Sequence, residues 1–229
     1  MNRDAASRVT ALRKPASGPA DERKTVLKKL LLSFALLASL AGAAWADTAP
    51  DAFVRTISNE VLDTAKADKA IQAGDIAKIV TLVDTKVMPH VNFEAVTRSA
   101  VGPQWRQATP EQRTKLQAEF KTLLVRVYAG ALTQIKDQTT EITKTQPVPN
   151  SSQVVVQSEV KGKGEPIKLD YRLDKVDAGW KIIDVNVGGI WLVTSYRSQF
   201  AQELSKGGLD GLIATLVERN AKAAGGTKS

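Results

Sequence analysis

The clearest alternation of apolar and polar positions lies in residues 165–204. The apolar members of its first part alternate with charged residues: Ile167, Leu169, Tyr171 and Leu173. This period of two places them on one face of a β-strand. A second strand is predicted over Trp180–Val187 after a short turn, so the two strands are expected to pair as an antiparallel hairpin. Beyond Gly188-Gly189, large apolar residues recur at every fourth position, which predicts an amphipathic helix from Leu192.

The chain before these strands has the period of helices. One apolar stripe covers residues 53–62, and a second covers residues 71–87 with a break near Gly74. Pro89 disfavours helix at the residue before it, so the pattern stops there. Asn92 is then a suitable N-cap for a short helix.

The sequence Thr109-Pro110-Glu111-Gln112 is a strong helix start. Thr109 is suited to the cap, Pro110 to the first helical position, and Gln112 to closing a capping box. The apolar stripe that follows predicts a helix of about 25 residues, which is long enough to lie across a sheet. Its apolar face includes Phe120.

Two further strands are predicted at Glu141–Thr145 and Gln153–Lys161, and a last helix at Leu209–Lys222, followed by a disordered tail over residues 223–229. The order of the predicted elements is helices, then a meander of strands, then helices. This order indicates an α+β fold with a roughly four-stranded antiparallel sheet covered by helices. We expect one domain over residues 47–222. The pattern leaves open whether the apolar faces enclose a filled core or a cavity.

Residues 1–46 have the pattern of a secretory signal peptide. A basic segment precedes an apolar run from Leu30 to about Ala41, and Ala44-Trp45-Ala46 supplies a small-x-small cleavage site, so cleavage is expected after Ala46. The alternative is an uncleaved membrane anchor, but the run is shorter than the roughly 20 residues of a spanning helix. The long segment before the apolar run suggests a start codon assigned too far upstream.

Cleavage changes the charge of the protein. Residues 1–46 hold eight Lys or Arg and three Asp or Glu, so the net charge falls from +8 to +3. The remaining basic residues are interspersed with acidic ones, which argues against nucleic acid as a partner. The chain has no cysteine, so it has neither disulfides nor a thiol nucleophile.

The candidate catalytic residues are few. His90 is the single histidine and cannot form a two-imidazole metal site. Asp184 shares a strand face with Trp180 and Ile182 and is a better candidate for a buried base than Asp170, although a hydrogen-bonded structural role fits it better. No phosphate-binding GxxxxGK[ST] motif is present. We therefore expect no catalytic residue, no metal and no cofactor.

Several segments resemble one family in order along the chain. They are Tyr171–Leu173, Trp180–Val185, Gly189-Ile190 and Ser195–Ala201, with Pro89–Glu94, Trp105–Arg113, Phe120, Leu123-Leu124 and Tyr128 upstream. Together they are similar to the MlaC / toluene-tolerance family, the periplasmic phospholipid-binding component of the Mla (maintenance of lipid asymmetry) system. Trp191 departs from the pattern, where a small or polar residue is expected.

This resemblance implies an NTF2-like body with an apolar pocket. It implies a soluble carrier in the periplasm of a Gram-negative bacterium that binds phospholipid and moves it between an outer-membrane lipoprotein–porin complex and an inner-membrane ABC transporter complex. It also implies that the protein is not an enzyme.

Strand alternation and helix phase then predict which residues contact the acyl chains: Leu123, Val127, Tyr128, Ala131, Val154, Val156, Ile167, Leu169, Tyr171, Leu173, Ile190, Val193, Tyr196 and Phe200. Arg126 and Arg197 are the candidates for the headgroup phosphate. Two other classes stay open: an NTF2-like enzyme on a small apolar substrate, in which Asp184 would be the buried acid, and a non-catalytic envelope adaptor with a filled core.

Overall fold

The structure, a computed structural model, describes residues 48–177 and 179–225. The predicted signal peptide, its cleavage site after Ala46 and the last four residues lie outside the described residues. Within the described part the fold is α+β, as the sequence predicted.

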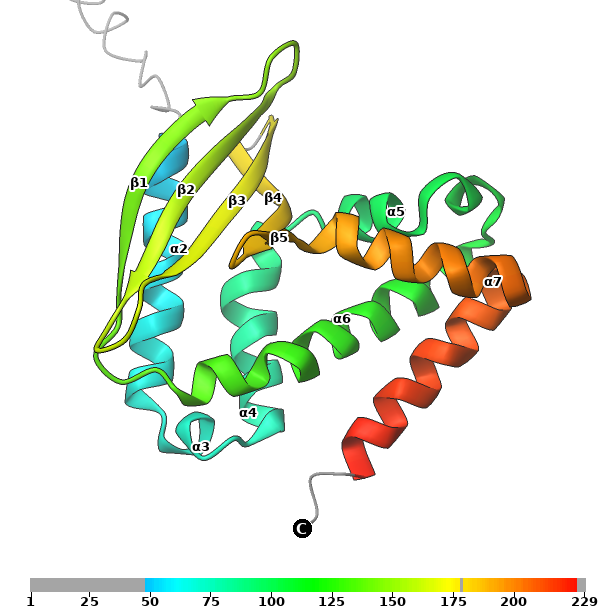
Figure 1. Ribbon diagram of the computed structural model, residues 1–229, viewed down its shortest axis with the longest axis horizontal. Helices are drawn as coiled ribbons and strands as arrows, with labels where there is room; N and C mark the ends of the chain where they lie inside the picture. Colours follow the sequence, from blue (N-terminus) through cyan, green and yellow to red (C-terminus); the bar gives the residue numbers. More distant parts are fainter. Residues whose placement is uncertain (1–47, 178, 226–229) are drawn as a thin grey trace, which may run out of the picture. The chain divides into compact units, whose positions relative to one another are not determined.

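The sheet has five antiparallel strands that follow one another in chain order (Figure 1). They are β1 (Thr139–Pro147), β2 (Gln153–Lys161), β3 (Ile167–Val176), β4 (Gly179–Val187) and β5 (Ile190–Trp191). Pro147 ends β1, an edge strand, where the missing N–H group of proline is tolerated. The register of β3 and β4 shifts between Arg172 and Leu173, so β4 carries one extra residue at that point.

The fifth strand is a correction to the four-stranded prediction. Gly188 and Gly189 have φ angles of 59° and 94°. Positive φ at both central residues is what a tight type I′ hairpin needs, and glycine adopts it without strain. The chain therefore turns back and pairs Ile190 with Val187 before the last helix begins, instead of entering that helix directly.

The helical segments begin and end close to their predicted positions. They are α2 (Pro50–Ala67), α3 (Lys69–Gln72), α4 (Ile76–Leu82), the π-helical turn η2 (Val83–Val87), the 3-10 turn η3 (Met88–His90), α5 (Phe93–Val101), the 3-10 segment η4 (Gly102–Gln107), α6 (Pro110–Thr133) and α7 (Leu192–Gly225). Asn92 caps α5 through its side chain, and Thr109 and Gln112 form the predicted capping box of α6.

The two predicted helices are both present within α7, where they meet at a kink. Gly208 lies between them with φ 61° and ψ −157°, a conformation that is essentially restricted to glycine. The second part continues through Gly225, beyond the predicted end at Lys222, because the alanines that follow Lys222 are strong helix formers.

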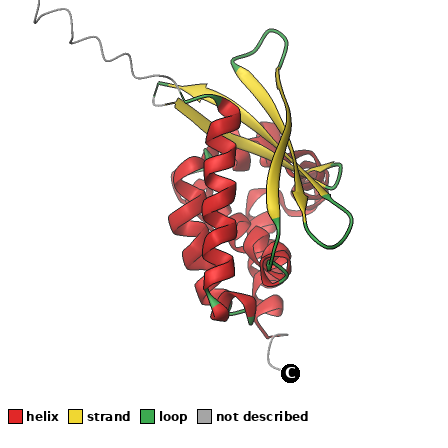
Figure 2. Ribbon diagram, turned by 90° about the vertical axis from the view of Figure 1, so that its left-hand side faces the viewer, coloured by secondary structure: helices red, strands yellow, loops and turns green. Residues whose placement is uncertain are grey.

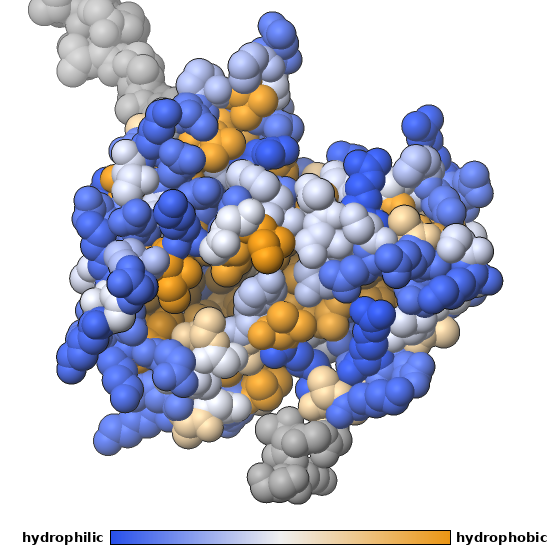
Figure 3. Space-filling model, viewed as in Figure 1, coloured by the Kyte–Doolittle hydropathy of each residue, from blue (hydrophilic) through white to orange (hydrophobic). Residues whose placement is uncertain are grey.

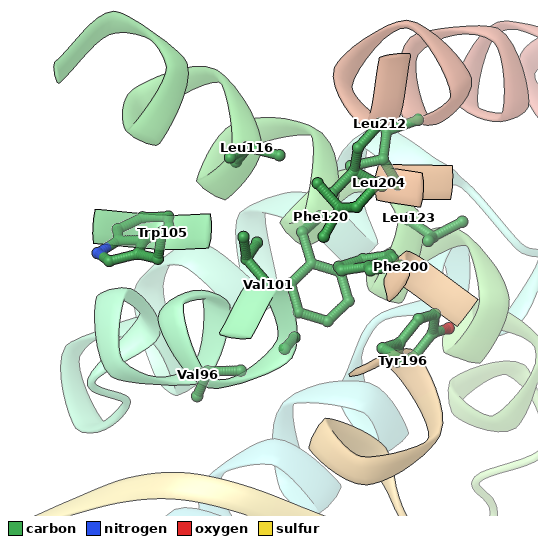
Figure 4. Close-up of a cluster of buried hydrophobic side chains, with 12 residues drawn as sticks. Val96, Val101, Trp105, Leu116, Phe120, Leu123, Tyr196, Phe200, Leu204 and Leu212 are labelled. Atoms are coloured by element: carbon green, nitrogen blue, oxygen red, sulfur yellow. The ribbon is translucent and has the colours of Figure 1, made fainter. Parts of the chain in front are cut away.

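The helices lie on one side of the sheet (Figure 2). Helix α2 packs against β1 and β2, while α5, α6 and α7 pack against one another. The α5–α6–α7 core centres on Phe120, whose ring centroid lies 5.0 Å from that of Tyr196 and 5.1 Å from that of Phe200 (Figure 4). A second core joins α2 to the sheet through Val54, Val156 and other apolar side chains. A third core joins α2, α3, α4 and α6. The three cores leave a cavity between the helices and the sheet.

Candidate functional site

A cavity of about 530 Å³ lies between the sheet and the helices. Of its 32 lining residues, six are polar or charged: Ser58, Lys121, Gln134, Gln138, Thr140 and Asp184. The others are aliphatic or aromatic, including Tyr128 and Tyr171. The volume is in the range of small-ligand sites, and the lining suits hydrocarbon.

Three lining residues are exposed to solvent, and they mark the mouth of the cavity: Ala131, Gln134 and Ile167. The first two belong to α6 or directly follow it, and Ile167 begins β3. Figure 3 shows hydrophobic side chains gathered around a hollow over α6 and the neighbouring sheet. Ile167 keeps 55% of its surface exposed, so the rim is apolar as well as the interior.

Away from this mouth, α2 and the middle of the sheet form part of the cavity wall. There the hydroxyl groups of Ser58 and Tyr171 lie 3.3 Å apart and form a hydrogen bond. Burial raises the pKa of Tyr171, and the hydrogen bond with Ser58 opposes this rise. Both hydroxyl groups are therefore neutral.

Asp184 is the buried carboxylate of the cavity wall. Its Oδ1 accepts hydrogen bonds from the backbone N–H groups of Val185 (2.9 Å) and Val193 (3.0 Å). Burial raises the pKa of Asp184, while these two hydrogen bonds and the nearby charge of Arg172 lower it. Because Val193 is in the first turn of α7, the carboxylate ties the start of that helix to β4.

Trp191, the departure noted in the sequence, has a structural role beside this junction. The guanidinium of Arg172 stacks over its ring, 4.7 Å from the ring centroid. This stack holds Trp191 against the neighbouring strands.

The structure brings together five of the fourteen residues predicted to contact acyl chains. Those that line the cavity are Tyr128, Ala131, Ile167, Leu169 and Tyr171. The strict alternation along β3 accounts for three of them, because side chains two residues apart share one face.

The other nine lie elsewhere. In the core between α2 and the sheet are Val154, Val156 and Leu173. In the α5–α6–α7 core are Leu123, Val193, Tyr196 and Phe200. Val127 and Ile190 are 55% and 60% exposed and do not line the cavity. Helix α6 has two apolar faces, one toward the cavity and one toward α7. Its predicted residues are therefore divided between the cavity lining and the α5–α6–α7 core.

The wall opposite the sheet was missed by sequence reasoning. It is built from residues of α2, α4, η2 and η3: Ile57, Ser58, Val61, Leu62, Ile79, Leu82, Val83, Val87 and Met88. Their apolar stripe is visible in the sequence, but periodicity does not say which helix faces which strand.

The two predicted headgroup residues do not line the cavity. Arg197 is exposed, and its guanidinium lies beside Gly102. Arg126 has a buried Nε with no hydrogen-bond partner among the described residues. Among the described residues, the cation on the cavity wall is Lys121, which pairs with Asp84 of η2 at 2.8 Å.

Over residues 48–177 and 179–225, no group of three or more His, Asp or Glu side chains is placed to hold a metal ion. The same part of the chain contains no helix that is both long and apolar enough to cross a membrane.

Comparison with known proteins identifies the family. Residues 55–218 match the model of the family described as MlaC protein. The chain belongs to the MlaC family. Among MlaC relatives, it is 25% identical over 187 residues to the toluene tolerance protein Ttg2D of Pseudomonas putida, covering 81% of this chain and 86% of the relative. It is 24% identical over 193 residues to the intermembrane phospholipid transport system binding protein MlaC of Haemophilus influenzae, covering 82% of this chain and 90% of the relative.

A solved structure is similar along nearly its whole length. The phospholipid-binding protein of Ralstonia solanacearum, determined in complex with a phospholipid, is 43% identical, with a TM-score of 0.74. The match covers 78% of this chain and 99% of that protein. This chain and that protein thus share one fold.

Proposed function

We propose that this MlaC-family protein binds a phospholipid and carries it through the periplasm between the outer-membrane and inner-membrane Mla complexes. The observation that supports this most strongly is the apolar cavity of about 530 Å³ with one solvent-exposed rim. A protein 43% identical to this chain was determined with a phospholipid bound, which supports the same ligand class here.

The acyl chains contact the cavity lining, including the five predicted residues that belong to it. Each methylene removed from water contributes about 0.8 kcal/mol, so hiding about 25 methylenes contributes on the order of 20 kcal/mol before the costs of binding. Such a ligand leaves very slowly by itself. Release therefore requires a partner that opens the cavity or competes for the lipid.

The headgroup stays at the mouth, because burying an unpaired phosphate is costly. Gln134 and Gln138 line the cavity just after the end of α6, so their amide groups are available to a headgroup beside the mouth. Arg126 and Arg197, the predicted headgroup residues, would meet the phosphate only outside the cavity, since neither lines it.

The protein acts without catalysis. Asp184, the one carboxylate on the cavity wall among the described residues, already accepts two backbone hydrogen bonds that position α7. Both hydrogen bonds end on Oδ1 and hold the carboxylate against the backbone at the start of α7. We therefore assign Asp184 a positioning role.

The test is a transfer experiment with protein purified after expression of the full chain. The protein is loaded with isotope-labelled phosphatidylethanolamine and mixed with vesicles that either contain or lack the inner-membrane Mla complex. The proposal predicts stoichiometric loading and rapid delivery only to vesicles with the complex. Equal delivery to both kinds of vesicle would contradict the carrier role, even if the protein binds lipid.

A further inference from the structure

The cavity wall formed by α2 and the middle of the sheet carries a pair of hydroxyl groups. Ser58 of α2 and Tyr171 of β3 line the cavity there, with their hydroxyl oxygens 3.3 Å apart. Tyr171 is paired across the sheet with Val156, and the next inward residue of β3 is Leu173. Both of these are completely buried in the core between α2 and the sheet. The hydroxyl pair therefore stands at the boundary between the cavity and a filled core.

One hydrogen of this pair has no acceptor. Each hydroxyl group carries one O–H donor, and a hydrogen bond between two hydroxyls uses only one of them. Among the described residues, neither oxygen takes part in any other hydrogen bond. One donor therefore points into the cavity or its walls without a protein partner.

Such a donor does not strengthen the binding of a purely apolar ligand. It contributes only if the ligand carries an acceptor that forms a hydrogen bond with it. A hydroxyl group that is held away from water without a hydrogen-bond partner destabilises the folded protein. Phenylalanine and alanine would fill the same space without that cost. The pair is thus suited to a ligand that brings a hydrogen-bond acceptor to this depth.

The depth of the pair limits where that acceptor lies on the ligand. Ile167 marks the mouth, and Tyr171 is four residues further along β3, which is about 13 Å at roughly 3.3 Å per strand residue. An oxygen that reaches the pair is therefore well below the headgroup. It is an ester carbonyl of a lipid drawn deep into the cavity, or an oxygen carried on an acyl chain.

We propose that Ser58 and Tyr171 form a hydrogen-bonding subsite that recognises an acceptor oxygen of the bound lipid below its headgroup. The subsite rests on the proposed lipid-binding function and adds selectivity to it. The cavity would then distinguish between lipids of equal hydrocarbon content by one oxygen at the right depth.

Competition between matched lipids tests this subsite. Protein purified after expression of the full chain is stripped of lipid and offered two mixtures. One contains a diester and a diether phosphatidylethanolamine with the same chains. The other contains the diester and the same lipid with one hydroxylated acyl chain. Native mass spectrometry gives the ratio of the two complexes for the wild type, Tyr171→Phe, Ser58→Ala and the double variant.

The wild type should prefer one oxygenated lipid by about two- to tenfold, which is the effect of one net hydrogen bond of 0.5–1.5 kcal/mol. Preference for the diester over the diether assigns the ester carbonyl, and preference for the hydroxylated chain assigns an acyl-chain oxygen. Either preference should disappear in Tyr171→Phe and in the double variant. Ser58→Ala should weaken it, which provides a second measurement if Tyr171→Phe folds poorly.

Tyr196→Phe is the matched control. Tyr196 is also a buried tyrosine, but it packs in the α5–α6–α7 core and does not line the cavity. Its variant should keep the wild-type ratios. Equal ratios for the wild type and Tyr171→Phe in both mixtures would overturn the subsite while leaving lipid binding intact. Failure of the wild type to bind any of the lipids would instead contradict the proposed function.

Discussion

The substitution Ala131→Trp tests whether the cavity is the acyl-chain site. Ala131 lines the cavity at its mouth and is exposed, so a larger side chain there can enter the cavity without displacing a buried neighbour. Tryptophan adds nine non-hydrogen atoms to the alanine side chain. If about five of them occupy space used by the lipid, about five methylenes return to water at a cost of about 0.8 kcal/mol each. The expected loss is about 4 kcal/mol, or roughly a thousandfold in affinity.

The assay measures lipid retained after purification and lipid bound in competition with labelled phosphatidylethanolamine. Val127→Trp is the matched control, because Val127 precedes Ala131 by about one turn of α6, is 55% exposed and does not line the cavity. It should bind lipid as the wild type does, and both variants should unfold close to the wild-type temperature. Equal affinities of the two tryptophan variants would refute the placement of the acyl chains in this cavity.

Three predictions concern stability. Asp184→Asn should become more stable relative to the wild type as the pH rises from the ordinary aspartate pKa of 3.8 through the raised pKa of Asp184, because the folded wild type disfavours the charged carboxylate in that range. Denaturant unfolding of both proteins at a series of pH values measures the difference in their stability. A difference that does not change with pH would contradict the prediction. Thr109→Ala should lower the free energy of unfolding by about 1 kcal/mol in chemical denaturation, because the capping box of α6 is lost. The control Thr122→Ala, within the same helix, should change the free energy of unfolding by less than about 0.5 kcal/mol. Phe120→Ala should lower the free energy of unfolding by about 3–5 kcal/mol, because it opens a void in the α5–α6–α7 core. A thermal shift no larger than that of Thr109→Ala would contradict this prediction, because it would mean that the core relaxes around the void.

Local signals in the sequence were sufficient for most of the secondary structure. The capping box at Thr109, the N-cap at Asn92 and the alternation along β3 each depend on neighbouring residues, and each is found where it was predicted. The fifth strand was missed because Gly188-Gly189 is compatible with several turns. Only pairing with β4 selects the type I′ hairpin.

The site was predictable only in part, because a cavity is a property of packing between distant segments. Along β3 the alternation identified Ile167, Leu169 and Tyr171 as cavity residues, since a strand has only two faces. A helix has a continuous surface, and α6 uses adjacent parts of it for the cavity and for α7. Phase alone could not separate Tyr128 from Leu123. Nor could it place α2 and η2 opposite the sheet.

Lipid analysis of the purified protein tests the central claim most directly. Protein expressed from the full chain in a Gram-negative host is purified without detergent, examined by native mass spectrometry, and extracted for lipid. A cavity of about 530 Å³ lined mainly by aliphatic residues predicts copurified phospholipid at close to one molecule per protein, released when the protein unfolds. Protein that is free of lipid, and that takes up none from vesicles, would contradict the assignment of this cavity to phospholipid.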